Sequence, residues 1–125
     1  MTEDKEQAAF VQWFRQRYPS EAFALRVSMN GLTFPGRGKF GAIMWNKMKA
    51  QGLTKGEPDI IILIPAYGYR YLAIEHKALE QAHKLTDEQR DHLLYHASRG
   101  ALAVETKGLD VLMDLVEDYM QCPDL

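Results

Sequence analysis

The sequence predicts an α/β fold in which a mixed β-sheet is flanked by helices, in the order α-β-α-β-β-α-β-α. Two observations lead to this prediction. Short apolar runs bounded by turn residues alternate with longer amphipathic segments, and the run at residues 59–64 is continuous, which suits a central strand covered on both faces. The 125 residues fit a single domain, residues 1–125, and 46% of them are hydrophobic, enough for a packed core.

The first half of the chain contains two predicted helices and one predicted strand. Residues 3–18 are expected to be helical, because Thr2 can cap this segment, acids occupy its first turn and a proline follows its end. Residues 22–29 are expected to be a strand, followed by a loop dense in turn residues. Residues 39–51 are expected to be a short helix, since Gly52 lies just past its end.

The second half begins with a predicted hairpin. A strand at residues 59–64 leads through a turn at 65–69 to a returning strand at 70–77. Thr86, with Gln89 three residues later, has the spacing of a capping box at the start of a helix. The remaining predicted elements are that helix, which ends at residue 99, a short strand at 101–105 and a last amphipathic helix at 109–120.

Charge is unevenly distributed along the chain. The formal net charge is −2, yet residues 22–56 contain six basic residues and no acid, a pattern typical of nucleic-acid contact. Phe40 and Trp45, which lie among these lysines, suit base stacking, but aromatic residues at helical spacing belong more often to a core. The residues expected to contact DNA are Arg37, Lys39, Lys47, Lys49 and Lys55.

The sequence also argues against several kinds of site and location. Cys122 is the only cysteine, so no internal disulfide can form, and no apolar run reaches the roughly 20 residues that span a bilayer. The polar, acidic start is unlike a secretory signal, so we expect a cytoplasmic protein with no membrane partner, in the host cell if it is viral. The segment GRGKFG at residues 36–41 lacks the G-K-[S/T] of a phosphate-binding loop, and no nucleotide cofactor is expected.

Glu75 and Lys77 place charged groups at the end of the predicted hairpin. They are two residues apart on a strand, so both side chains leave the same face, and the hairpin brings Asp59 beside Glu75. Two adjacent carboxylates repel each other unless a cation lies between them, and Mg²⁺ or Mn²⁺ prefers oxygen ligands. The alternative is an exposed ion pair between Glu75 and Lys77, which would contribute at most roughly 1 kcal/mol.

The motifs in this half of the chain resemble those of a known family. Gly56, Pro58 and Asp59 form G-x-P-D, and an apolar strand is followed by LAIEHKA at residues 72–78 and LTDEQRDHL at 85–93. This combination resembles the phage-type, stand-alone VRR-NUC proteins of the PD-(D/E)XK nuclease superfamily. The resemblance implies a restriction-endonuclease-like core and a metal-dependent endonuclease that hydrolyses phosphodiester bonds in DNA, often at four-way (Holliday) junctions or flaps. It also implies a homodimer.

The resemblance assigns roles to the residues around the hairpin's end. Asp59 and Glu75 become metal ligands for Mg²⁺ or Mn²⁺. The backbone carbonyl of His76 becomes a further ligand, so that the side chain of His76 has little expected role. Lys77 becomes the catalytic lysine, placed to orient or activate water or to stabilise charge on the phosphate.

Two further residues are assigned on helices. Gln89 matches an active-site glutamine of the family, although a plain capping box with Thr86 explains the same residue. The family also uses an acid on its first helix. Glu6 is slightly preferred to Glu3 for this role, because it lies one turn before Phe10 on the inward face.

Other interpretations stay open at this point. The same fold can serve as a branched-DNA-binding module in which catalysis is incidental, or as a nuclease that acts on 5′-flaps. A pure binding domain has no need of two adjacent carboxylates facing phosphate, which favours the enzyme. His92 and His96 have the spacing of metal ligands on a helix, but no third zinc ligand lies nearby, which favours surface roles or DNA contacts.

Overall fold

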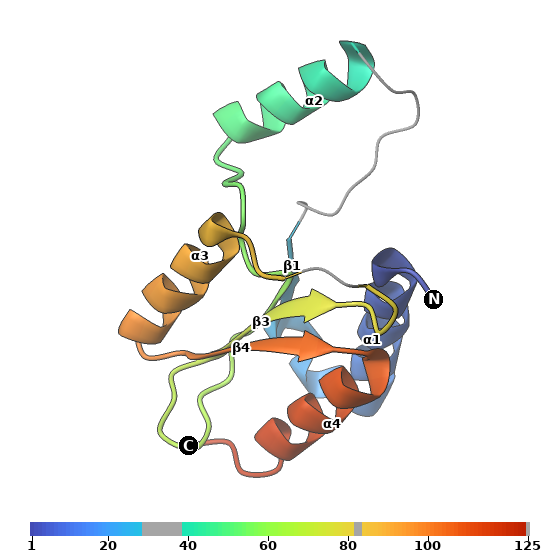
Figure 1. Ribbon diagram of the computed structural model, residues 1–125. Coiled ribbons are helices and arrows are strands. Elements are labelled where there is room, and N and C mark those ends of the chain that lie inside the picture. Colours follow the sequence, from blue (N-terminus) through green and yellow to red (C-terminus); the bar gives the residue numbers. More distant parts are fainter. Residues whose placement is uncertain (29–38, 82–83, 125) are drawn as a thin grey trace.

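The computed structural model describes residues 1–28, 39–81 and 84–124 (Figure 1). No helix in these ranges is long and apolar enough to cross a membrane. The helices and strands, in chain order, are α1 (Glu3–Arg17), the 3₁₀-helix η1 (Pro19–Ala24), β1 (Leu25–Val27), α2 (Lys39–Ala50), β2 (Ile60–Ile62), β3 (Leu72–Lys77), α3 (Asp87–Ser98), β4 (Leu102–Lys107) and α4 (Leu109–Met120).

The four strands form one mixed sheet in the order β1-β2-β3-β4. The first three strands pair antiparallel, with Ile60 of β2 opposite Ile74 of β3. Strands β3 and β4 are parallel, with Leu72 opposite Leu102, and α3 provides the crossover that parallel neighbours require. The α/β class and the mixed sheet predicted from the sequence are therefore confirmed.

Helices cover both faces of this sheet. Helices α1 and α4 pack on one face, and α3 packs against β3 and β4 on the other (Figure 1). Side chains on β3 alternate between these two layers. Leu72 and Ile74 enter the core beneath α1 and α4, whereas Glu75 and Lys77 lie on the α3 side, where Gln89 of α3 contacts both. The polar end of the hairpin thus lies on one face only.

The segment after α1 departs from the prediction of a strand at residues 22–29. Its first part belongs to the 3₁₀-helix Pro19–Ala24, and only Leu25–Val27 pairs with β2. Proline at the first position of a helical turn has the φ angle that the turn requires, so the chain turns here before it reaches the sheet. The strand prediction is therefore wrong up to Ala24.

Two other strands differ from their predicted lengths. Strand β2 pairs only over Ile60–Ile62, although residues 59–64 were predicted. Strand β4 extends to Lys107 rather than to residue 105, because its parallel pairing with β3 continues to the end of that strand. Local sequence patterns do not contain this information, since the length of a ladder depends on its partner.

Helix α2 stands apart from the sheet and the other helices in Figure 1. Ile43 is 60% exposed, and Trp45 is half-buried but lies outside the core cluster that the described residues form. The ammonium nitrogen of Lys49 lies 5.9 Å from the centroid of the Trp45 ring. The core interpretation of Trp45 is therefore wrong, while the Phe40 side chain lies outside the described part of the structure.

Candidate active site

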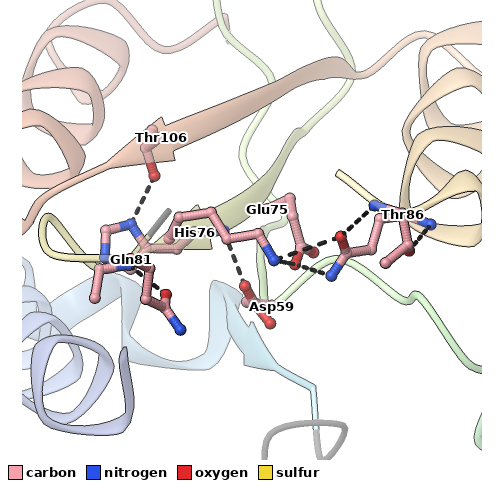
Figure 2. A network of polar contacts seen from close by, with 9 residues as sticks. Asp59, Glu75, His76, Gln81, Thr86 and Thr106 are labelled. Atoms are coloured by element: carbon pink, nitrogen blue, oxygen red, sulfur yellow. Dashed lines mark hydrogen bonds and ion pairs between the residues drawn. The ribbon is translucent and has the colours of Figure 1, made fainter. Parts of the chain in front are cut away.

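The open end of the β2–β3 hairpin brings Asp59 beside Glu75. Because Ile60 lies opposite Ile74, the residue before β2 meets the next residue of β3. Oδ2 of Asp59 accepts a hydrogen bond from the backbone N–H of His76, at 2.8 Å from the nitrogen (Figure 2). The Asp59 carboxylate is therefore held against β3 at the position that the hairpin predicts.

Glu75 and Lys77 leave β3 on the same face and are almost sealed from solvent, with exposed fractions of 1% and 7%. Nζ of Lys77 lies 3.5 Å from Oε1 of Glu75 and 3.4 Å from Oε1 of Gln89. The side-chain amide of Gln89 donates to Oε1 of Glu75 at 2.8 Å. The exposed ion pair considered as an alternative is therefore wrong, because these three side chains form a buried cluster.

Gln89 takes part in both arrangements that the sequence left open. It completes a capping box with Thr86 at the start of α3, and its amide also bonds Glu75. Gly56 allows the chain before β2 to approach the start of α3. It has a φ of +89°, and a Cβ at this position would lie 2.7 Å from the backbone carbon of Glu88. The chain leading into β2 thereby passes against the first turn of α3.

Burial dominates the electrostatics of the two carboxylates. Burial, and then the negative charge of Asp59, raise the pKa of Glu75 to about 8, although the Lys77 ammonium opposes this shift. Burial also raises the pKa of Asp59, despite the hydrogen bond that this carboxylate accepts from the His76 backbone. The nearby Glu3 carboxylate raises both pKa values further. Both carboxylates are therefore costly to ionise in the folded protein, and a bound cation would lower that cost.

The donor set fits a hard divalent cation. Oε2 of Glu75 is buried and has no hydrogen-bond partner among the described residues, which is costly unless a cation or ligand contacts it. Asp59 supplies the second carboxylate. No cluster of three or more His, Cys, Asp or Glu side chains suited to a metal occurs in the described ranges, so further ligands would be the His76 backbone carbonyl, water or substrate.

The pKa of Glu75 predicts how stability depends on pH when no divalent ion is bound. The folded protein retains a proton on Glu75 up to about pH 8, whereas the unfolded chain releases it near pH 4.5. The free energy of unfolding should therefore fall as pH rises between these values, by up to about 4 kcal/mol. Urea titrations in EDTA from pH 5 to 8.5 measure this, with Glu75→Gln as the control that should flatten the dependence.

On the opposite face of β3, the His76 side chain is fully buried and both of its ring nitrogens have polar partners. Its Nε2 lies 2.8 Å from Oε1 of Glu6, and its Nδ1 lies 2.8 Å from the hydroxyl of Thr106 on β4. The second oxygen of Glu6 accepts from the backbone N–H of Leu79 at 3.2 Å. The expectation that the His76 side chain has little role is therefore wrong, because it joins α1, β3 and β4.

The two acids of the first helix occupy different places. Glu6 faces inward, as predicted, but its carboxylate is engaged by His76 on the core side of the sheet. Glu3 is the acid on α1 whose charge acts on Asp59 and Glu75. Glu3 was the second choice from the sequence. Because its charge acts on both carboxylates of the buried cluster, it suits the role of an active-site acid better than Glu6 does.

The predicted DNA-binding residues lie mostly on or near α2. Lys39, Lys47 and Lys49 belong to this helix, and Lys55 precedes β2, with Nζ 3.6 Å from Oε1 of Glu88. Arg37 lies outside the described residues. Three of the five predicted residues, Lys39, Lys47 and Lys49, are therefore on the helix that stands apart from the rest of the fold in Figure 1.

Comparisons with known proteins identify the family and support the fold. A family model described as the VRR-NUC domain matches residues 1–110, a range that contains all the residues of the buried cluster. A solved structure described as a VRR_NUC domain protein is 25% identical, with a TM-score of 0.77, and the match covers 99% of this chain and 92% of that chain. No curated protein matches.

Proposed function

Because the chain belongs to the VRR-NUC domain family, whose members are nuclease-type domains, we propose that it is a metal-dependent endodeoxyribonuclease that hydrolyses phosphodiester bonds. The observation that carries this proposal is the buried, unsatisfied Oε2 of Glu75 beside the Asp59 carboxylate. A structural role gains nothing from two buried acids that are costly to ionise, one of which, Asp59, raises the cost of ionising Glu75 further. A site for a cation and a phosphate explains both the unsatisfied Oε2 of Glu75 and the burial of two adjacent carboxylates.

Each side chain of the cluster has a definite task in this proposal. Asp59, Glu75 and the His76 carbonyl would hold Mg²⁺ or Mn²⁺, which supplies Lewis-acid polarisation of the phosphate and a more acidic water. The Lys77 ammonium stabilises negative charge on the phosphate or orients the attacking water. The Gln89 amide fixes Glu75 through one hydrogen bond and accepts from Lys77 through the other atom of the same group.

The proposed substrate is branched DNA. The lysines of α2 and Lys55 supply phosphate contacts that are independent of sequence, which suits recognition by shape. We place the whole chain, residues 1–125, in one nuclease domain that acts as a homodimer on four-way junctions, in viral recombination or repair in the cytoplasm. Two active sites related by a two-fold axis suit the two-fold symmetry of such a junction.

The test compares three labelled substrates: a four-way junction, a 5′-flap and a plain duplex, each with Mg²⁺, Mn²⁺ or EDTA. We expect symmetric cuts in the junction, a strict requirement for metal and products that carry a 5′-phosphate. Sedimentation analysis of the protein alone, and with the junction, measures whether it is a dimer.

The outcomes separate the possible functions. Cutting confined to the flap substrate would replace the junction assignment with a flap nuclease, and a monomer in solution would favour that outcome. Tight junction binding with no cutting in any metal would contradict the enzyme and leave a binding module. Cutting that persists unchanged in EDTA would contradict the metal requirement.

A further inference from the structure

A cavity of about 630 Å³ lies between the β1 edge of the sheet and α3. Its volume falls within the roughly 300–1,000 Å³ of pockets that bind small molecules. Its walls are partly apolar, with Val27 from β1, Pro58 and Ile61 at β2, and Tyr95 from α3. The cluster of Asp59, Glu75, Lys77 and Gln89 does not line it.

The cavity lies next to that cluster. Two of its lining residues, Pro58 and Ile61, are one residue before and two residues after Asp59 in the chain. Ile61 also leaves the strand on the same face as Asp59. On α3, His92 lies three residues beyond Gln89, an advance of about 4.5 Å along the helix. A substrate group next to a phosphate held by the cluster would therefore face this cavity.

The side chains that line the cavity suit a flat, uncharged ring better than a phosphate. Tyr95 is 55% exposed and presents an aromatic surface, and the guanidinium carbon of Arg99 lies 5.1 Å from the centroid of its ring. Aromatic side chains of this kind stack on bases. The carboxylates of Glu57 and Asp91 offset the charge of Arg26, so the cavity offers a phosphate no net attraction.

The polar groups of the cavity provide hydrogen-bond donors and acceptors for base edges. Burial, and then the neighbouring His92, lower the pKa of His96, whose Nδ1 lies 2.5 Å from the Tyr71 hydroxyl. Burial therefore favours the uncharged form of the His96 ring. Together with the carboxylates and Arg26, this ring gives the cavity the mixed polarity that a nucleobase presents.

From this size, position and chemistry we propose that the cavity receives the base of an unpaired nucleotide adjacent to the cleaved bond. This inference rests on the proposed nuclease function and narrows its substrate. A base that is paired and stacked in a duplex cannot turn its face to Tyr95 without leaving the helix. The protein therefore selects DNA in which the nucleotide at the cut can leave the helix at low cost, as next to the branch point of a junction or at a flap.

The test removes one base at a time. Substrates with a single abasic site at successive positions around the cut are compared for wild type, Tyr95→Ala and Tyr95→Phe, by kcat/KM. In wild type and Tyr95→Phe, one abasic position should reduce kcat/KM about tenfold, the effect typical of one lost base–aromatic stack. In Tyr95→Ala the intact substrate should be cut about tenfold more slowly. The same abasic site should then have no further effect.

The control is Tyr69→Ala, which removes a 40% exposed tyrosine in the turn at the far end of the hairpin and should leave the abasic profile unchanged. An abasic profile without a sensitive position, or one that is the same in Tyr95→Ala, would overturn the base pocket while leaving the nuclease intact. Binding of the same substrates in EDTA, measured by fluorescence anisotropy, gives an independent readout. A Tyr95-dependent abasic effect on binding, without any cutting, would support the pocket and contradict the enzyme.

Discussion

Replacement of Lys77 by alanine is expected to reduce the rate of DNA cleavage at least about a hundredfold, the typical contribution of one positioned acid–base or charge-stabilising group. Lys77 is the cation that lies 3.5 Å from Glu75 within the buried cluster. Its removal leaves the charge that develops on the phosphate without this partner. Single-turnover rates at saturating protein measure the chemical step separately from DNA binding.

The chain contains a matched control for this experiment. Strand β4 repeats the Glu-x-Lys spacing at Glu105 and Lys107, in register with Glu75 and Lys77 of β3, but both residues of β4 are exposed. Lys107→Ala removes the same charge from the neighbouring strand and should leave the chemical step within about twofold of wild type, as for a surface substitution. Equal losses in the two variants would contradict a specific catalytic role for Lys77.

Replacement of Glu6 by alanine is expected to lower the free energy of unfolding by about 3 kcal/mol. The change leaves Nε2 of His76 and the backbone N–H of Leu79 without their acceptor. It also removes an anion from beside a fully buried imidazole, and a buried polar group without a partner costs its full desolvation penalty. Chemical denaturation at pH 7 measures the loss, with the exposed Asp4→Ala in the same turn as the control.

A double substitution distinguishes a structural from a catalytic role of Glu6. Glu6→Leu combined with His76→Leu replaces the buried polar pair with apolar side chains, so its cost should be well below the sum of the two single changes. If Glu6 supports the fold only, the double variant should also retain most of its cleavage activity. Restored stability with cleavage lost as completely as in Glu75→Gln would instead place Glu6 in the reaction.

The main features of the fold were predictable because the local sequence signals favour the same helices and strands that the packed structure contains. The last helix, at residues 109–120, has the predicted bounds, and the capping box of Thr86 begins α3 where the sequence indicates. The strand bounds were less predictable. Pro19 starts a 3₁₀ turn within a stretch whose apolar residues suit a strand, and the ladders of β2 and β4 end where their partners end.

The cluster on the α3 face was also accessible to sequence reasoning, because a hairpin fixes which residues meet at its open end. The shared face of Glu75 and Lys77 follows from their spacing on one strand, whereas the place of Gln89 beside them came from the family resemblance. The network of Glu6, His76 and Thr106 was not accessible. Its members lie 70 and 30 residues apart in sequence, and its only local signal is a polar residue amid a buried strand.

Hydrogen exchange at the buried imidazole of His76 can be used to measure whether the core is intact. Its ring is fully buried, with its two nitrogens beside Glu6 of α1 and Thr106 of β4, so a ring proton reaches water when the packing of α1 or β4 around it opens. Hydrogen exchange at this ring therefore reports opening of the face of β3 that packs against α1 and the core. A substitution of Glu75 or Lys77, on the face covered by α3, that leaves this exchange unchanged has altered the buried cluster and not the core, although both residues are immediate neighbours of His76 in the chain.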